Sequence, residues 1–400
     1  MRRQPGPFTL AMSALEPALM IYLDNAATSF PKPEAVYRML DHYLREVGAN
    51  PGRSGHRRAV EAERLIGEAR RALASLLGVS DPDRIIFGHN ATDGLNIALK
   101  GFLRPGDHVV TSDLEHNSIT RPLTGLEKKG WITVSRIASH AGFIEPAEVR
   151  SALRPQTRLV AVTHGSNVFG TIQPIGEIAE VAHAGGARIL VDAAQTAGVA
   201  PLDIEAMGLD MVAFTGHKSL LGPMGTGGLA LLPGVDPEPW REGGTGTDSS
   251  NPLHPRDYPA KLEGGTPNAA GIAALAEGAR YVARRTPEAV RRHEVSLAAL
   301  LRELVAGDER FTLHGGGDPS RELGIVSFTV RGYSPNEFAA ALDEAYDIAV
   351  RPGLHCAPGA HRSLGTWPDG TVRVSMGPFT TEEEIRDAVR AMREIAAAAA

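Results

Sequence analysis

The sequence of 400 residues contains one cysteine, Cys356. A single cysteine excludes an intrachain disulfide, and nothing indicates an oxidising compartment. An excess of positive charge is also absent, because 41 basic residues face 47 acidic ones and the formal net charge is −6. This balance argues against a protein whose main task is to bind nucleic acid. Hydrophobic residues at 42% and charged residues at 22% fit an ordinary globular chain.

Long apolar runs are missing as well. Beyond the N-terminal stretch no 18 consecutive apolar residues occur, so we expect no membrane-spanning helix and no membrane partner. Residues 8–20 are mildly apolar and follow Arg2 and Arg3, but Glu16 and several prolines lie in or beside them, and no clear cleavage site follows. We therefore expect residues 1–20 to form a disordered tail rather than a secretion signal, and the protein to be cytoplasmic.

Short apolar runs alternate with longer amphipathic ones from about residue 84 onward. The candidate strands are Arg84–Phe87, His108–Thr111, Ile132–Val134, Arg158–Val162, Arg188–Val191, Asp210–Phe214 and Gly228–Leu232. Helical stretches between several of them are Asp93–Leu103, Ser118–Lys129, Pro146–Leu153 and Ile175–Ala184. This alternation is typical of an α/β fold with a mostly parallel sheet that helices cover on both faces.

A second unit is expected after this region. Residues 234–268 are irregular and rich in glycine and proline, and a helical run at Asn268–Arg285 follows them. The remaining chain contains candidate strands at Ile325–Val330 and Val372–Ser375, and a last helix that begins near Thr381.

The length is compatible with two domains, and no internal repeat occurs. A long amphipathic helix is expected at Arg57–Leu77, before the first strand. We predict a large domain over residues 31–280 and a smaller α+β domain built from residues 21–30 and 281–400.

Polar side chains follow five of the predicted strands. They are found in Asn90–Thr92, Glu115–Asn117, His164–Asn167, Asp192–Gln195 and Thr215–Lys218. Ligands of open α/β sheets bind beyond the carboxyl ends of the strands. We therefore expect these five groups to share one site.

Lys218 and Asp192 point to the chemistry of that site. A lysine after a strand is usually an exposed loop residue, but a desolvated lysine can form a Schiff base with a carbonyl. Asp192 ends an apolar strand, where a buried cation would stabilise its carboxylate. The protonated ring nitrogen of pyridoxal phosphate is such a cation, so the pair predicts pyridoxal chemistry. No Gly-x-x-x-x-Gly-Lys run supports a nucleotide-type phosphate loop.

Five segments carry a family resemblance. Leu190–Thr196, Phe214–Lys218 and Gly264–Asn268 resemble the signature of aminotransferase class V, and within that class the cysteine desulfurases and selenocysteine lyases. Tyr22–Thr28 and Gly353–Pro358 are similar to the same group, and the set spans nearly the whole chain in order. The resemblance implies a fold-type I pyridoxal phosphate-dependent transferase with pyridoxal 5′-phosphate as its cofactor.

The resemblance also implies roles around the cofactor. Lys218 would form the Schiff base, Asp192 would pair with the pyridinium nitrogen, and His116 would stack on the ring. Gln195 would donate a hydrogen bond to the phenolic oxygen, with Asn167 beside it. His116 would in addition be an acid or base for the thiol protons.

Phosphate binding would involve Thr92, Thr215 and His217. Thr266 would reach the phosphate of the neighbouring subunit, so the protein would be a homodimer. The run that contains Thr92 reads Asn-Ala-Thr-Asp where the family more usually has Thr-Thr-Glu, which leaves Thr92 but removes a neighbouring hydroxyl.

Plainer interpretations of these residues stay open at this point. His116 is also compatible with a helix start, since Asp113 and Ser118 look like caps. Thr92 and Thr215 are, taken singly, compatible with routine strand-end hydroxyls.

Cys356 decides which pyridoxal reaction is expected. A lone cysteine is most often a small buried hydrophobe. This one lies in a glycine- and proline-rich loop, with Arg351 and His355 near enough for their positive charges to favour the thiolate. The cluster of His355, Cys356 and His361 matches no standard zinc spacing. We therefore predict an exposed reactive thiol and no metal site.

The resemblance then implies a cysteine desulfurase. Arg373, together with Asn167 and Arg351, would bind L-cysteine, Cys356 would take its sulfur as a persulfide, and L-alanine would leave. The segment between Cys356 and Arg373 is short, as in the compact-loop group of the family, which implies a sulfur-acceptor protein as a partner. The alternatives are selenocysteine as the substrate, a carbon–sulfur lyase that does not need Cys356, a non-catalytic scaffold, and Arg373 as a surface residue at a strand end.

Overall fold

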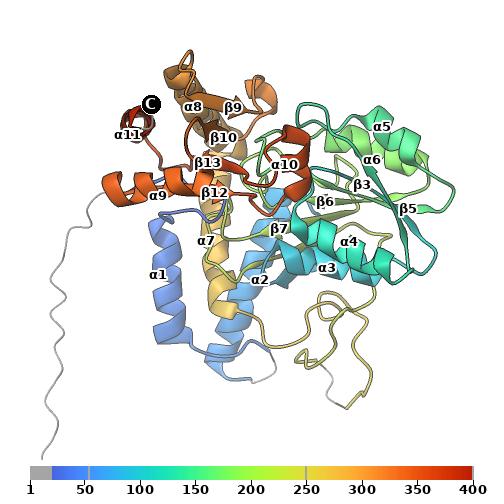
Figure 1. Ribbon diagram of the computed structural model, residues 1–400. Coiled ribbons are helices and arrows are strands. Elements are labelled where there is room, and N and C mark those ends of the chain that lie inside the picture. The colour runs from blue at the N-terminus through green and yellow to red at the C-terminus, as the bar shows by residue number, and fades with distance from the viewer. Residues whose placement is uncertain (1–19, 53–54, 248–249, 399–400) are drawn as a thin grey trace, which may run out of the picture.

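The computed structural model describes residues 20–52, 55–247 and 250–398. Seven strands form one sheet in the order β2–β8–β7–β6–β5–β3–β4 (Figure 1). Their bounds are Ile85–Gly88 (β2), Gly227–Leu231 (β8), Met211–Thr215 (β7), Arg188–Asp192 (β6), Thr157–Thr163 (β5), His108–Ser112 (β3) and Thr133–Ile137 (β4). The predicted tail falls on residues 1–19, outside the described residues, and on Met20.

Six of these strands run in the same direction. β7, β6, β5, β3 and β4 pair in parallel, and β2 points the same way because β8 is antiparallel to both of its neighbours, β7 and β2. All seven predicted strands occur, and the prediction of a mostly parallel sheet is confirmed. The carboxyl ends of these six strands therefore meet at one edge of the sheet.

Helices cover the sheet on both faces. Alternate residues of a strand point to opposite faces, and in β6 Ile189 and Val191 belong to one apolar core while Leu190 belongs to another. α2, α5, α6 and α7 contribute to the first core, and α3 and α4 contribute to the second. Their bounds are Arg57–Leu77 (α2), Pro146–Ala152 (α5), Ile175–Ala184 (α6), Ala269–Arg285 (α7), Ala91–Phe102 (α3) and Asn117–Lys128 (α4). Burial on both faces explains why the strands read as continuous apolar runs.

A smaller antiparallel sheet has the order β12–β13–β10–β9. Its strands span Arg351–Gly353 (β12), Thr371–Ser375 (β13), Ile325–Val330 (β10) and Phe311–His314 (β9). Its apolar core is shared with the helices Pro287–Val305 (α8), Pro335–Tyr346 (α9) and Glu382–Ala397 (α11). The start of α11 was predicted from its capping residues, and Thr381 and Glu384 form that capping box.

The beginning of the described chain joins this smaller sheet. β1 (Ile21–Tyr22) pairs in parallel with β11 (Ile348–Ala349), and Leu23 lies in the apolar core of the smaller sheet. The assignment of residues 21–30 to the smaller domain and the domain boundary at residue 280 stay predictions, and α7 continues through residue 280 to Arg285.

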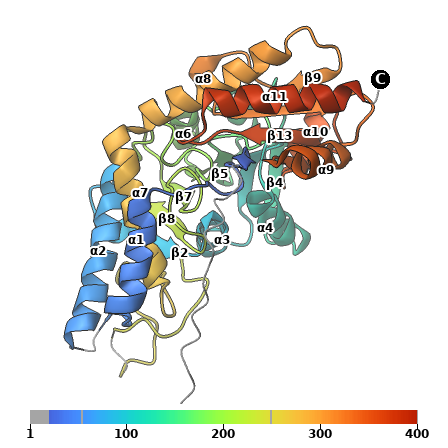
Figure 2. The ribbon, with the colours of Figure 1, turned by 90° about the vertical axis from the view of Figure 1, so that its left-hand side faces the viewer.

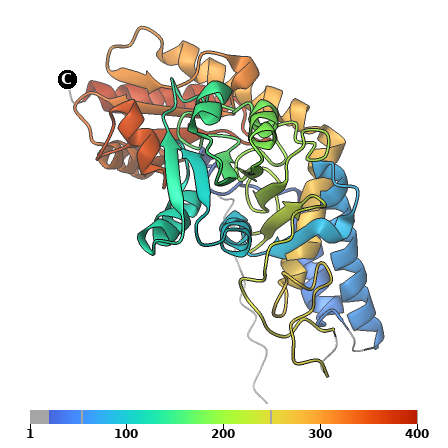
Figure 3. The ribbon, with the colours of Figure 1, turned by 90° about the vertical axis from the view of Figure 1, so that its right-hand side faces the viewer.

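Several short elements were not predicted. They are α1 (Glu34–His42) with a π-helical turn at Tyr43–Val47, α10 (Pro358–Leu364), and two 3-10 turns at Pro82–Arg84 and Pro319–Arg321. α1 and α2 both pack against α7 and stand beside it (Figure 2). The described part of residues 234–268 contains no helix or strand and forms a long loop at the end of the molecule away from the smaller sheet (Figures 1 and 3). None of the helices among the described residues is both long and apolar enough to cross a membrane.

Candidate active site

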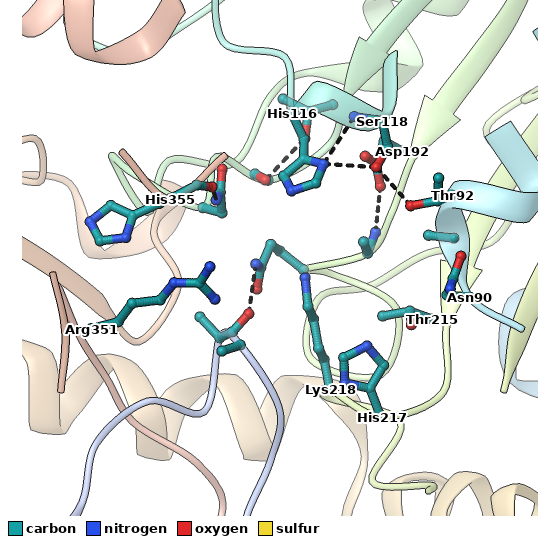
Figure 4. A pocket seen from close by; sticks show the side chains of 18 of the residues that line it. Asn90, Thr92, His116, Ser118, Asp192, Thr215, His217, Lys218, Arg351 and His355 are labelled. Carbon is teal, nitrogen blue, oxygen red and sulfur yellow. Dashed lines mark hydrogen bonds between the residues drawn. The ribbon is translucent and has the colours of Figure 1, made fainter. Parts of the chain in front are cut away.

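A cavity of about 250 Å³ lies at the carboxyl edge of the large sheet, and we call it the strand-end cavity (Figure 4). The structure brings most of the predicted site residues together around it. These residues are Thr92, His116, Asn167, Asp192, Gln195, Thr215, His217, Lys218, Arg351 and Arg373. Each of the five strand-end groups contributes at least one lining residue, as the parallel strand ends require. Their roles toward a ligand stay predictions.

Lys218 follows β7 and extends its amine into the strand-end cavity (Figure 4). Desolvation lowers the pKa of this amine from 10.5 to about 8, and the opposing charge of Asp192 limits the decrease. About a tenth of the amine is therefore neutral at pH 7, far more than for an ordinary lysine, and the neutral form is the one that reacts with a carbonyl.

Asp192 is the last residue of β6 and is only 5% exposed. Its Oδ1 accepts a hydrogen bond from the backbone N–H of Ala194 at 2.9 Å. No ion pair of Asp192 occurs within the described part of the chain. A buried carboxylate in this setting is suited to a cationic group of a ligand.

His116 begins a helix and also lines the strand-end cavity, and its stacking on a ring stays a prediction. It is the N-cap residue of α4, where its Nδ1 accepts a hydrogen bond from the Ser118 backbone N–H at 3.1 Å. Asp113 is not the cap of this helix. Desolvation lowers the pKa of His116, so the ring is neutral near pH 7. Because Nδ1 accepts, the proton of the neutral ring lies on Nε2.

The residues around the start of α3 suit a phosphate group. Thr215 Oγ1 and His217 Nδ1 are buried and have no hydrogen-bond partner, and both residues line the strand-end cavity. Asn90 and Ala91 at the N-terminus of α3 line the same side of it. A helix N-terminus with free N–H groups is a ready-made anion site. The orphaned polar atoms therefore fit the phosphate of pyridoxal phosphate, as Lys218 fits its aldehyde and Asp192 its ring nitrogen.

Thr92 and Gln195 already form hydrogen bonds within the chain. Thr92 is exposed, and its hydroxyl is already hydrogen-bonded to that of Ser118 at 2.8 Å. Ser118 was considered only as a helix cap, so its bond to Thr92 was missed. Gln195 Nε2 donates to the Ala26 carbonyl at 3.1 Å, which leaves one N–H of its amide for a ligand.

Arg373 lies on β13 and is 1% exposed, so it is not a surface residue. Its Nη2 donates to Asp24 Oδ1 at 2.8 Å, and its Nη1 donates to the Asn167 carbonyl at 3.2 Å. Asp24 was missed as a functional residue, although the segment Tyr22–Thr28 carried the family resemblance. Its carboxylate fixes the guanidinium at the cavity, and Arg351 on β12 lines the cavity beside it.

Cys356 is exposed and lies outside the lining of the strand-end cavity. His355 and Cys356 adopt left-handed backbone conformations with φ of 48° and 61°. Such conformations cost about 1–2 kcal/mol per residue for side chains other than glycine. Two hydrogen bonds hold this turn: Asn167 Nδ2 donates to the His355 carbonyl at 2.6 Å, and the Asn117 N–H donates to the Cys356 carbonyl at 2.7 Å.

The expectation that His355 supplies a positive charge to the thiol is wrong. Burial lowers the pKa of His355 to about 2, so its ring is uncharged at neutral pH. Its Nε2 lies 3.1 Å from Thr371 Oγ1, and its ring packs near that of His361 with centroids 5.5 Å apart. His361 is also buried, with its pKa lowered to about 4. The two neutral rings therefore pack together beside the Cys356 turn and do not add positive charge to it.

Thr266 lies apart from the strand-end cavity of its own chain. It is exposed and lines a separate cavity of about 110 Å³ with residues of β2 and the adjoining loops. Among the described residues, no group of histidine, cysteine and acidic side chains is suited to hold a metal ion.

Sequence comparison identifies relatives of the whole chain. The family model of aminotransferase class-V matches residues 21–387. A protein of Methanothermobacter thermautotrophicus named probable cysteine desulfurase is 37% identical over 382 residues, which cover 94% of each chain. A probable cysteine desulfurase of Halalkalibacterium halodurans is 34% identical, over 92% of this chain and 90% of that one.

Solved structures agree with these matches. The apo structure of a cysteine desulfurase from Thermococcus onnurineus NA1 has a TM-score of 0.88 at 32% identity and covers 95% of both chains. A cysteine desulfurase of Escherichia coli has a TM-score of 0.85 at 27% identity, again over 95% of both chains. The predicted fold-type I architecture is confirmed. The chain thus belongs to the aminotransferase class-V family and, within that family, to the cysteine desulfurases.

Proposed function

We propose that this protein is a pyridoxal 5′-phosphate-dependent cysteine desulfurase, which converts L-cysteine to L-alanine and takes the sulfur onto Cys356 as a persulfide. One observation carries the proposal: an exposed thiol lies on a turn whose backbone is hydrogen-bonded to Asn167, a residue that lines the strand-end cavity. A transaminase of the same class needs no thiol in this place. The names of the relatives support the same reaction.

The cofactor would occupy the strand-end cavity. Pyridoxal phosphate supplies an aldehyde for the amino group of the substrate and a ring that withdraws electrons from its α-carbon. Lys218 Nζ would hold the aldehyde and then remove the α-proton, for which a pKa of about 8 is well matched. Asp192 would stabilise the protonated ring nitrogen, and Thr215 and His217 would donate to the phosphate.

Arg373 would bind the carboxylate of L-cysteine. Its guanidinium is held by Asp24, so little conformational entropy is lost when the substrate binds. Arg351 would add a second positive charge on the same side of the cavity.

Sulfur transfer would then follow at Cys356. Its thiolate attacks the substrate sulfur, a sulfur–sulfur bond forms, and the carbon–sulfur bond breaks with its electron pair left on carbon. That carbon takes up a proton, and L-alanine leaves. His116 Nε2 would donate and accept the thiol protons near pH 7, where its ring is neutral.

The working protein would be a cytoplasmic homodimer that passes sulfur to an acceptor protein. Thr266 is exposed and lies away from the strand-end cavity of its own chain, which is compatible with a contact to the phosphate of a second subunit. The single cysteine agrees with a reducing compartment. The large domain would span residues 31–280, and the smaller one would carry the Cys356 turn.

The test measures alanine and sulfide release from L-cysteine in the presence of a reductant, for the wild type and for Cys356→Ala. We expect equimolar products from the wild type, and from the variant neither product but the same yellow cofactor absorption. Because Cys356 is the only cysteine, a mass increase of one sulfur atom on the wild type assigns the persulfide to it.

Two results would contradict the proposal. Full activity of Cys356→Ala would indicate a carbon–sulfur lyase. A wild type that is inactive on L-cysteine but active on L-selenocysteine would indicate a selenocysteine lyase.

A further inference from the structure

A second cavity opens at Cys356, between α3 and α4. Its volume is about 540 Å³, which is within the range of ligand-binding pockets. It is lined by Thr92, Asn96, Lys100, His116, Asn117, Ser118, Arg121, Pro122, Gly125, Leu126, Lys129 and Cys356. We call it the α3–α4 groove. Thr92, His116 and Ser118 also line the strand-end cavity, so the groove reaches the outer side of the active site.

The charge of the α3–α4 groove is opposite to that of the whole molecule. Three of its lining residues are basic, Lys100, Arg121 and Lys129, and none is acidic, whereas the protein carries a net charge of −6. The charge of Arg121 is close enough to lower the pKa of His116. Three cations along the groove that opens at Cys356 create a local positive potential that attracts anions.

These cations also lack acidic partners. Within the described residues the side chains of Arg121 and Lys129 form no ion pair and no hydrogen bond, and the Lys100 amine contacts the ring of Trp240. Elsewhere in the molecule exposed arginines pair with acidic neighbours, as Arg64 on α2 does with Glu61 and Arg136 on β4 with Glu127. Unpaired cations around a cavity are free to bind the carboxylates of a partner.

We propose that the α3–α4 groove is the docking site of an acidic protein segment whose thiol accepts sulfur from Cys356. The inference rests on the proposed function and adds to it the place and the charge of the acceptor. The acceptor thiolate attacks the outer sulfur of the Cys356 persulfide, and a new sulfur–sulfur bond forms. The old bond breaks and Cys356 leaves as a thiolate, so no net oxidation or reduction occurs.

The test separates persulfide formation from its discharge. Holoenzyme is loaded with one equivalent of L-cysteine, and the persulfide is measured by mass. It is then mixed with one of two peptides that carry a single cysteine, flanked on each side by two glutamates or by two lysines. We expect the acidic peptide to discharge the persulfide about tenfold faster than the basic one at low salt, and the preference to fall at physiological salt.

Charge reversal locates the effect in the groove. The double variant Lys100→Glu/Lys129→Glu should lose the preference for the acidic peptide. The single variant Lys129→Glu should weaken the preference, and Lys128→Glu is its matched control, because this exposed lysine is adjacent in sequence but does not line the groove. Equal effects of Lys128→Glu and Lys129→Glu would overturn the assignment to the groove.

A steric variant tests the groove without a change of charge. A side chain at Gly125 on α4 points into open space, since an added Cβ meets no atom within 4 Å. Gly125→Trp should therefore slow both peptides while 2-mercaptoethanol still discharges the persulfide, and Gly125→Ala should behave as the wild type. If Gly125→Trp dissociates a homodimer instead, the groove belongs to a second copy of the chain and the proposal is wrong.

The two proposals fail in different ways. If no persulfide forms on Cys356, the cysteine desulfurase function is wrong and this inference falls with it. If the persulfide forms but both peptides discharge it at the same rate, only the docking site is wrong.

Discussion

The strand-end cavity and the Cys356 turn lie next to each other but are built on different principles. The cavity is lined by side chains at the ends of parallel strands, which the buried sheet holds in place. The turn is a loop in two left-handed conformations that hydrogen bonds from Asn117 and Asn167 maintain. The first owes its geometry to the fold, and the second owes it to a few local contacts. Cofactor chemistry and sulfur transfer should therefore respond to different substitutions.

Lys218→Ala should have the largest effect, because it should impair both cofactor binding in the strand-end cavity and the sulfur transfer that depends on it. Loss of the amine that holds the cofactor and moves the α-proton is expected to lower alanine formation by about 10³-fold. The yellow absorption of the bound cofactor should shift or disappear as well. Lys128→Ala is the control, because Lys128 is exposed and lines neither cavity. A Lys218→Ala protein with more than a tenth of wild-type activity would contradict the role of Lys218.

Asn167→Ala should separate the two regions. It removes the 2.6 Å hydrogen bond to the His355 carbonyl, so the Cys356 turn can relax from its left-handed conformation. Displacement of a reacting group by about 1 Å costs on the order of 10²-fold in rate. We expect persulfide formation to fall by that factor, measured by mass in a single turnover, while cofactor absorption remains. If Asn167→Ala lost cofactor binding and sulfur transfer to the same extent, the cavity and the Cys356 turn would not respond separately to substitution.

The pH dependence of cofactor uptake tests the cavity alone. Only the neutral amine of Lys218 attacks an aldehyde, and its pKa is lowered to about 8. In cofactor-free protein the uptake rate should rise about tenfold per pH unit below 8 and level off above it. Asp192→Asn removes a negative charge that raises this pKa, so it should move the midpoint to lower pH. A midpoint near the ordinary lysine value of 10.5 would contradict the desolvated cavity.

Thr215→Val and Thr92→Val compare two hydroxyls with the same predicted role. Thr215 Oγ1 is buried without a partner, which costs about 1–3 kcal/mol. Thr215→Val should therefore stabilise the cofactor-free protein by about 1 kcal/mol in denaturant unfolding, yet weaken cofactor binding about tenfold. Thr92→Val should change both quantities less, because Thr92 is exposed and already bonded to Ser118. Equal effects of the two variants would contradict the claim that Thr215 matters more than Thr92 for cofactor binding.

The sequence predicted the cavity better than the turn, for a physical reason. Asp192 and Lys218 follow buried apolar strands, so the strand pattern alone brings them to one edge of the sheet. The left-handed conformation of His355 and its burial depend on packing against Thr371 and His361, which no local pattern encodes. For that reason the sequence suggested a charged His355, and the structure has a neutral one.

Short helices such as α1 and α10 were missed because a few turns give too weak a periodicity to stand out. The start of α11 was predicted, because Thr381 and the acids after it form a local signal that needs no tertiary partner.

The pairing of the first described residues with the last part of the chain sets an order on biosynthesis. Asn25 and Ala26 are hydrogen-bonded to Ser375, about 350 residues later, and Ala26 and Ala27 line the strand-end cavity. On the ribosome this wall of the cavity cannot close until β13 has emerged, whereas the large sheet can assemble earlier. A nascent chain that stops before β13 therefore has the lysine but not a closed cavity around it. The proposed cofactor would thus be captured only after β13 has been synthesised.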